Sequence, residues 1–450
     1  MLGTSVALLA ASALPALAAG KPAWQPRPFE ANVSNDVRHE DGEPSIAVNP
    51  RNPKNIILIY LRNNDFFVPN AANGQHLPEQ RDLTQHIQGC DYAVTFDGGK
   101  TWTRHPLPAN DPVANPAYDN CSDSIVVFDK QGVAHVMAAA YSSLAFAASG
   151  QYRYISSRDG GRSWSKPLTV APGMVGPEAY PEEYGGLRTY DDRPWLTHDD
   201  STRTLYIDGT QVRIDGDGAG FVYLTSYTHG QKRWSDPIVI PTGPLGSAPL
   251  GAAFGMVALV VSPPPNTPTS DGCPADQCYE FVYSTDRART VKRIATRIPT
   301  SDRAQTVADP TRKGVFYVMV PIGAGKLSVY RTPDAGKTWS KPASFGVPNT
   351  SVVKPWLAIS PTGVVGAGWR AERSDRTYDF WAAVSYDKAK TFSKPIRLSR
   401  AVSPPAPPYY AAGDDTSTVA LSKTHLYAAW GDWRGGHLED IWWGGFALAR

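Results

Sequence analysis

Short runs of apolar residues recur along the chain in pairs, and a turn of polar residues, Gly or Pro separates the two runs of each pair. The first pair is SIAV from Ser45 and NIILIY from Asn55. Similar first runs lie in EPSIAVNP, DSIVVFDK, RPWLTHDD, KPWLAISP and a looser RAQTVADP, which start at Glu43, Asp123, Arg193, Lys354 and Arg303. Runs of this length bounded by turn residues are typical of β-strands, and no long stretch shows the period of a helix. We therefore predict an all-β protein in which each pair supplies an inner strand and the strand beside it.

A second pattern is a hairpin signature that occurs in six copies. The clearest copies are TFDGGKTW from Thr95, SRDGGRSW from Ser157 and TPDAGKTW from Thr332. Weaker copies are SYDKAKTF, STDRARTV and a decayed SYTHGQKRW, which begin at Ser385, Ser284 and Ser226. The shared Asp can accept hydrogen bonds from N–H groups of the turn, the Gly can adopt a positive φ, and the aromatic residue can bury a large apolar face. We therefore expect structural roles for Asp97, Asp159, Asp286, Asp334 and Asp387 and for Trp102, Trp164 and Trp339.

The hairpin signature resembles the Asp-box, or BNR repeat, of sialidases and related β-propellers, and the likeness extends from about Phe29 to the C-terminus. Successive copies begin about 48 to 70 residues apart, which fits one four-stranded blade. The resemblance implies a single β-propeller, for which we count seven blades, with six or eight as alternatives. The last unit, from Asp414, lacks a fourth strand, so we expect residues 29–34 to complete it and close the ring. The inner strand of the fourth blade is poorly marked within residues 249–261.

Composition and charge agree with a turn-rich β protein and argue against a nucleic-acid partner. The 450 residues include 39 Gly and 40 Pro, and the formal net charge is only +2, which leaves no basic stripe for a phosphate backbone. Residues 1–19 have the pattern of a secretory signal peptide, residues 20–28 that of a linker or disordered segment, and residues 29–450 form the predicted propeller. We therefore expect a secreted protein, periplasmic or extracellular, that is monomeric and has no membrane span in its mature chain.

Four cysteines in an exported chain predict two disulfides. Cys273 and Cys278 bracket a Pro-containing loop and can close it, which leaves Cys90 to pair with Cys121. No cysteine spacing resembles a metal cluster. We therefore predict no cofactor, with a calcium ion bound between loop carboxylates as the alternative.

Candidate site residues gather at the starts of the inner strands, which in a propeller lie on the face opposite the hairpin turns. The aligned runs place six polar residues at one equivalent position: Glu43, Asp123, Arg193, Arg303, Lys354 and Thr416. The two acids fall on the first two blades and the three cations on later ones. The ends of second strands and the loops that enter inner strands add Arg62, Arg370, Arg434, Tyr190, Asp192 and Tyr410. A ring of mixed charges also fits a wet channel whose side chains pair with one another.

The resemblance implies glycosidase chemistry at this face: arginines bind a substrate carboxylate, an acid protonates the leaving oxygen and a Tyr is the nucleophile. The catalytic candidates are Asp123, Glu43, Tyr190 and Tyr410. The substrate-binding candidates are Arg193, Arg303, Lys354, Arg370, Arg62, Asp192 and Arg434. The chain departs from the family's Phe/Tyr-Arg-Ile-Pro motif at its first inner strand, which reads Asp41-Gly42-Glu43-Pro44-Ser45-Ile46 and has Glu43 where an arginine is expected.

Three functions stay open at this point. The leading one is a secreted, sialidase-like glycoside hydrolase that acts on a glycan with an acidic sugar. A polysaccharide lyase acting on uronate-containing glycans would share the fold and use a Tyr or a His as the base, for which His39, His76 and His86 are histidine candidates. A non-catalytic propeller that binds a glycan or a protein is favoured by the missing arginine motif and by the long insertion at residues 63–89.

Overall fold

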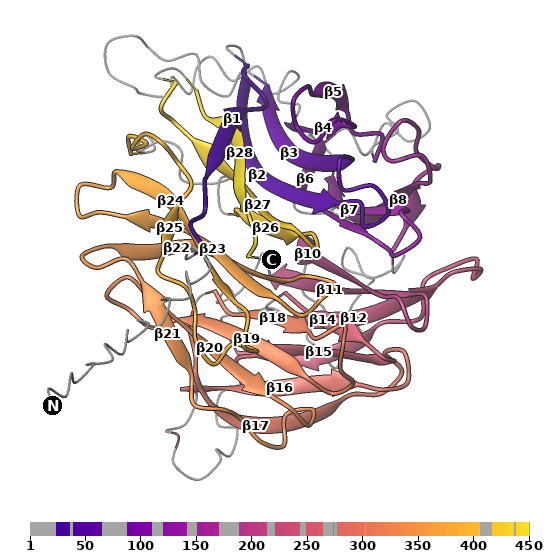
Figure 1. The fold of residues 1–450 in the computed structure, drawn as a ribbon. Helices are drawn as coiled ribbons and strands as arrows, with labels where there is room; N and C mark the ends of the chain where they lie inside the picture. The colour runs from indigo at the N-terminus through magenta and orange to yellow at the C-terminus, as the bar shows by residue number, and fades with distance from the viewer. Residues whose placement is uncertain are drawn as a thin grey trace, which may run out of the picture.

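The structure is a computed structural model that describes residues 24–36, 39–64, 88–109, 120–141, 151–170, 189–213, 221–243, 249–263, 273, 277–301, 303–405, 416–435 and 438–449. These residues form 28 strands in seven four-stranded antiparallel sheets, and they form no helix. The sheets stand around a common centre as the blades of a β-propeller (Figure 1). The predicted fold class and blade number are therefore confirmed. The described part of the chain contains no helix that could serve as a membrane span.

The first six blades follow the chain in order, each running from its inner to its outer strand. Blade 1 comprises β2 (His39–Val48), β3 (Ile56–Asn64), β4 (Gln88–Thr95) and β5 (Thr103–Pro106). Blade 2 comprises β6 (Asn120–Phe128), β7 (Ala134–Tyr141), β8 (Gln151–Ser157) and β9 (Leu168–Thr169). Blade 3 comprises β10 (Thr189–Asp199), β11 (Thr204–Arg213), β12 (Phe221–Thr228) and β13 (Ile238–Pro241).

The next three blades repeat this order. Blade 4 comprises β14 (Gly251–Ala253), β15 (Met256–Val261), β16 (Cys278–Ser284) and β17 (Lys292–Pro299). Blade 5 comprises β18 (Gln305–Ala308), β19 (Phe316–Pro321), β20 (Lys326–Thr332) and β21 (Ala343–Gly346). Blade 6 comprises β22 (Ser351–Ile359), β23 (Val365–Glu372), β24 (Tyr378–Ser385) and β25 (Ile396–Arg397). The poorly marked inner strand of blade 4 is thus the three-residue β14.

Blade 7 joins the two ends of the described chain. Its strands are β26 (Thr418–Leu421), β27 (His425–Asp432) and β28 (Asp440–Ala447), followed by β1 (Phe29–Asn32) as the outermost strand. In Figure 1 the indigo β1 lies beside the yellow β28. Phe29 is paired with Gly445 and Asn32 with Trp442. This pairing confirms the expected closure, which leaves no unpaired edge between the first and last blades.

The hairpin signature forms the turn between the third and fourth strands of a blade. In blade 1 the Thr95 hydroxyl donates to Asp97 Oδ1 at 2.7 Å and accepts the Gly99 N–H at 3.0 Å. Asp97 also accepts the N–H of Thr101 at 3.0 Å and its hydroxyl at 2.7 Å. The Thr101 hydroxyl and N–H lower the pKa of Asp97, because both bonds favour the carboxylate. The same bonds to a hydroxyl residue recur at Asp159, Asp286, Asp334 and Asp387.

The aromatic residue of the signature also attaches blades 1, 2, 5 and 6 to the blade that precedes each of them. The ring contacts are Trp102 with Trp443 at 5.2 Å, Trp164 with Tyr92 at 5.5 Å, Trp339 with Phe281 at 5.5 Å and Phe392 with Phe345 at 4.1 Å. The Gly of the signature lies in the same interface, since a Cβ added at Gly99 would come within 1.9 Å of the Trp443 ring. The small residue therefore has a packing reason in addition to its positive φ of 86°.

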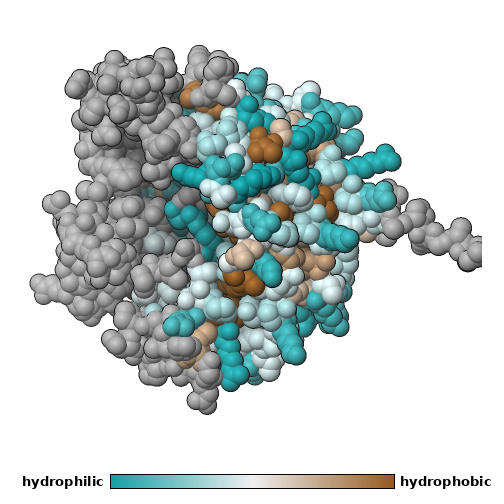
Figure 2. All heavy atoms as spheres, turned by 90° about the vertical axis from the view of Figure 1, so that its left-hand side faces the viewer, coloured by the Kyte–Doolittle hydropathy of each residue, from teal (hydrophilic) through white to brown (hydrophobic). Residues whose placement is uncertain are grey.

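The core consists of clusters shared between neighbouring blades, rather than one central body. The cluster around Ile57, Tyr92 and Val136, for example, joins blades 1 and 2. Figure 2 shows hydrophilic residues over much of the described surface on one side, with hydrophobic residues in separate patches. Both predicted disulfides are present, with Cα atoms 5.4 Å apart for Cys90 and Cys121 and 6.3 Å apart for Cys273 and Cys278.

Candidate functional site

Four of the six aligned polar residues occupy the same unusual backbone position. Glu43, Asp123, Arg193 and Lys354 have φ values of 53°, 48°, 52° and 50°. Each lies where the pairing of its inner strand with the second strand shifts register, which marks a β-bulge. The left-handed conformation costs a non-glycine residue about 1–2 kcal/mol, and such strain is concentrated at functional sites. The bulges turn these four residues out of the regular strand at one rim of the propeller.

The sequence shows why the bulges form there. Pro44, Pro194 and Pro355 follow three of the four residues. Proline has no N–H to donate to the ladder, so it is accommodated at a bulge but not in a central regular strand. The other two aligned residues, Arg303 and Thr416, come two positions before β18 and β26, where these shorter inner strands begin. All six aligned residues therefore lie at or just before the start of the regular part of an inner strand.

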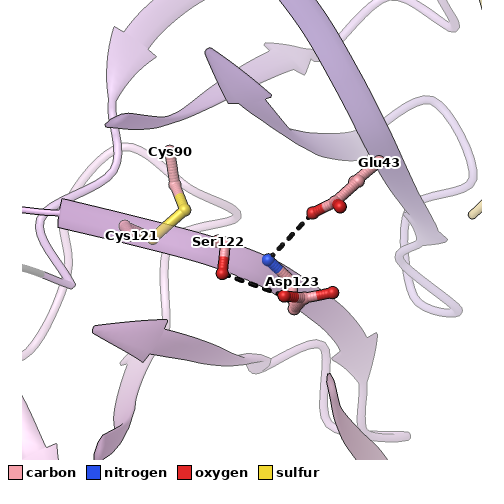
Figure 3. Close-up of a disulfide and its surroundings, with 5 residues drawn as sticks. All are labelled: Glu43, Cys90, Cys121, Ser122 and Asp123. Atoms are coloured by element: carbon pink, nitrogen blue, oxygen red, sulfur yellow. Dashed lines mark hydrogen bonds between the residues drawn. A yellow bond between two sulfur atoms is a disulfide. The ribbon is translucent and has the colours of Figure 1, made fainter. Parts of the chain in front are cut away.

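The bulge residues of blades 1 and 2 are in direct contact. Figure 3 shows the Glu43 carboxylate pointing at the backbone of Asp123, and Glu43 Oε2 accepts the Asp123 N–H at 3.1 Å. The Ser122 hydroxyl donates to Asp123 Oδ2 at 2.9 Å. The Cys90–Cys121 disulfide lies beside this pair and ties β4 of blade 1 to β6 of blade 2. The hydrogen bond from Glu43 of blade 1 thus holds the backbone of Asp123, and the disulfide at Cys121 fixes β6 two residues before it.

The positive charges of Arg193 and Arg303 act on the Asp123 carboxylate. Burial raises the pKa of Asp123, and the positive charges of Arg193 and Arg303 counteract that rise. Arg193 comes from blade 3 and Arg303 from the entry to blade 5. One acid therefore interacts with two guanidinium groups from different blades, while Lys354 occupies the equivalent bulge on blade 6 and is buried.

A pocket opens beside Asp123 and Arg193. Asp123, Arg193 and Thr416 line it together with Ser45, Trp195 and Trp356. The two tryptophans come from blades 3 and 6, and their rings meet at 5.6 Å with an angle of 53°. Because blades 3 and 6 are not neighbours, this contact crosses the centre of the ring. The lining of the pocket therefore combines two aromatic rings with one acid and one cation.

Sequence reasoning missed the two tryptophans as site residues. The available signal was the shared Pro-Trp at Pro194-Trp195 and Pro355-Trp356, immediately after a cationic residue in both blades. An aromatic residue in an apolar run is by default assigned to the core.

Three other predicted arginines make contacts away from the pocket lining. Arg370 donates to the Gly431 carbonyl at 3.0 Å and stacks on Tyr378 at 3.9 Å, so it joins blades 6 and 7. Arg434 pairs with Glu30 and Asp432 at 2.9 and 2.6 Å. Arg62 pairs with Asp91 within blade 1 at 3.1 Å.

The tyrosine and histidine candidates are only partly placed. Tyr190 and Asp192 lie on β10 and pair with β11, and their side chains are outside the described residues. Tyr410, His76 and His86 lie outside the described residues altogether. His39 Nδ1 is 2.8 Å from Asp36 Oδ2. The predicted signal peptide is also outside the described part, while Trp24 of the predicted linker contacts Phe446.

Similarity to known proteins is confined to the fold. No family model matches the chain, and no curated protein sequence matches it. A protein of unknown function from Dyadobacter fermentans DSM 18053 has a TM-score of 0.53 and 13% identity, over 93% of this chain and 98% of its own. The Hadza microbial sialidase Hz136 has a TM-score of 0.49 and 14% identity, over 80% of this chain and 74% of its own. The NanB sialidase from Streptococcus pneumoniae has a TM-score of 0.41 and 15% identity, over 93% of this chain and 70% of its own.

Proposed function

We propose that this protein is a secreted glycoside hydrolase that binds a glycan with an acidic sugar at the mouth of its central channel. The observation that carries the proposal is the pocket lined by Asp123, Arg193, Trp195 and Trp356, with the positive charge of Arg303 also acting on Asp123. The resemblance of the hairpin signature to that of sialidases supports the same class of substrate. The two disulfides support export, because they form and persist in oxidising compartments.

Each residue type suits one part of this reaction. Arg193 and Arg303 offer planar forks to the sugar carboxylate, and Lys354 adds a point charge. Asp123 is the general acid, since burial raises its pKa and favours the protonated form that must donate to the leaving oxygen. Glu43 holds the Asp123 backbone through its 3.1 Å hydrogen bond. Tyr190, three residues before Arg193 on β10, is the first nucleophile candidate and Tyr410 the second.

The test is an assay of the purified protein on sialosides and on uronate-containing oligosaccharides, with product masses determined. Hydrolysis adds one water to the products and elimination adds none. Asp123→Asn should lower kcat by about 10²- to 10⁴-fold, the usual worth of a general acid. Asp236→Asn, on the exposed surface of blade 3, is the matched control and should leave activity unchanged. Turnover that is equal in the wild type, in Asp123→Asn and in Arg193→Ala/Arg303→Ala would contradict the proposal.

A non-catalytic glycan-binding propeller is the second candidate. It is favoured by Glu43, which stands where an arginine is expected from the family motif, and by the way the positive charges of Arg193 and Arg303 already oppose the charge of Asp123. In that case the wild type binds an acidic oligosaccharide without converting it, and Arg193→Ala/Arg303→Ala weakens binding. Isothermal titration with the oligosaccharides of the activity assay separates the two candidates, because detectable turnover excludes a pure binder. An unsaturated product would instead identify a lyase.

A further inference from the structure

A group of four metal-ligand side chains lies on the face opposite the pocket, between blades 2 and 3. Asp129 follows the end of β6, and His135 is the second residue of β7. His198 is near the end of β10, and His229 directly follows β12. One ligand atom from each residue lies within 4.8 Å of those of the other three. The pocket residue Asp123 is near the start of β6, so the strand separates the two sites.

The hydrogen bonds of Asp129 and His135 show which ligand atom of each residue faces the cluster. His135 Nε2 is 3.4 Å from Asp129 Oδ2. Metal–nitrogen and metal–oxygen bonds of about 2.0–2.1 Å in a tetrahedron require ligand atoms about 3.3 Å apart. Asp129 Oδ1 is occupied by the Val133 N–H at 2.8 Å, and His135 Nδ1 is bonded to the Tyr154 hydroxyl at 2.7 Å. Only Asp129 Oδ2 and His135 Nε2 therefore face the cluster.

The other two histidines complete the group. His198 Nδ1 lies 3.1 Å from Asp200 Oδ1, which is outside the cluster, but makes no hydrogen bond with it. Both ring nitrogens of His198 are buried without a hydrogen-bond partner among the described residues, and so is His229 Nε2. The His198 side chain is only 3% exposed, and those of His135 and Asp129 are each 1% exposed. Buried ring nitrogens without a hydrogen-bond partner destabilise the fold, and a bound cation would satisfy them.

The histidine rings of the cluster also pack against one another. The rings of His135 and His198 are nearly parallel, 5.5 Å apart, and His229 lies 5.2 Å from His135.

The cluster explains the one decayed hairpin signature. In SYTHGQKRW of blade 3, Thr228 stands where the other copies have the turn aspartate, and His229 follows it. Thr228 receives its backbone support from Gln231, whose Oε1 accepts the Thr228 N–H at 2.9 Å. The hairpin that lost its aspartate is thus the hairpin that supplies a cluster histidine.

We propose that Asp129, His135, His198 and His229 bind one divalent transition-metal ion, Zn²⁺ in the first instance, that ties blade 2 to blade 3. Three imidazoles and a carboxylate match the donor preferences of Zn²⁺, and four protein ligands make a closed, structural site. Tyr154 is a positioning residue, since its hydroxyl orients His135 through Nδ1, the ring nitrogen that does not face the metal.

The test uses the full chain purified without a histidine tag, stripped with a chelator and titrated with Zn²⁺. We expect one ion per chain by mass spectrometry, a higher melting temperature with Zn²⁺, and with Co²⁺ the intense visible absorption of a tetrahedral site. His229→Gln should abolish these effects. Tyr154→Phe should weaken Zn²⁺ binding by about 10- to 100-fold, as loss of an outer-shell partner does. His105→Gln, on exposed β5, should bind as the wild type does.

Two results would overturn the proposal. One is a wild-type protein that retains no Zn²⁺ after desalting and shows no change in melting temperature. The other is Zn²⁺ binding that is equally tight in the wild type and in His229→Gln, which would show an adventitious ion. If His229→Gln does not fold, the Tyr154→Phe affinity and the Co²⁺ spectrum of the wild type decide the question. None of these readouts depends on glycan turnover.

Discussion

The two disulfides offer a matched test of how the propeller is held together around its pocket. The Cys90–Cys121 bond joins strands of different blades and spans 31 residues of sequence. The Cys273–Cys278 bond spans five residues and lies at the start of β16. Replacing each pair by two alanines removes the same atoms. The two variants therefore differ mainly in the length of chain that the bond constrains and in the distance of the bond from Asp123.

The expected losses follow from the chain entropy of the unfolded state. Closing a loop of 31 residues is worth about 3.7 kcal/mol, and closing a loop of five residues about 2 kcal/mol. An unfolding entropy of roughly 2.1 cal/mol/K per residue gives about 0.9 kcal/mol/K for 450 residues. The melting temperature should therefore fall by about 4 °C for Cys90→Ala/Cys121→Ala and by about 2 °C for Cys273→Ala/Cys278→Ala.

The measurement is thermal unfolding of both variants and the wild type at equal concentration, followed by the glycan assay at 25 °C. Only Cys90→Ala/Cys121→Ala should also lower activity or glycan affinity, because Cys121 lies two residues before Asp123. A loss of stability that is larger for the five-residue loop would refute the entropic reasoning. Unchanged activity in Cys90→Ala/Cys121→Ala would show that the disulfide does not position the acid.

Two further predictions concern the hairpin turns. Gly99→Ala should lower the melting temperature more than Gly98→Ala does. Both glycines have a positive φ, but only a Cβ at Gly99 would lie 1.9 Å from the Trp443 ring. Equal losses of melting temperature would exclude packing as the reason for the glycine at position 99. For Asp159, desolvation opposes ionisation, but hydrogen bonds from Ser163 prevail and lower its pKa to about 2. Because the folded pKa is below the unfolded value of about 3.9, the stabilisation is complete above about pH 4 and is lost as the pH falls towards 2. The melting-temperature difference between the wild type and Asp159→Asn should therefore shrink over that range, and a constant difference would argue against an ionised turn.

Much of the fold could be predicted from local patterns in the sequence. Paired apolar runs specify strands through their length and the turn residues around them, and the hairpin signature marks the third turn of most blades. The closure by β1 followed from counting strands, because a propeller with a three-stranded last blade would leave an edge unpaired. Pairing of the cysteines followed from the short loop between Cys273 and Cys278. The register of the charged rim was also predictable, since the bulge residues share one place in the repeat.

The sequence by itself thus indicated most of the strands, favoured seven blades over six or eight and predicted the residues that each blade presents at its rim, because these depend on interactions between near neighbours in the chain. Only the tertiary structure decided which side chains meet. Arg370 and Arg193 look equivalent as cations in sequence, yet Arg370 is buried against blade 7 while Arg193 lines the pocket. Trp195 and Trp356 meet across the ring, and His229 meets His135 between two blades. Such encounters depend on the curvature of the ring and on packing between sheets, which are set by contacts between residues far apart in the chain.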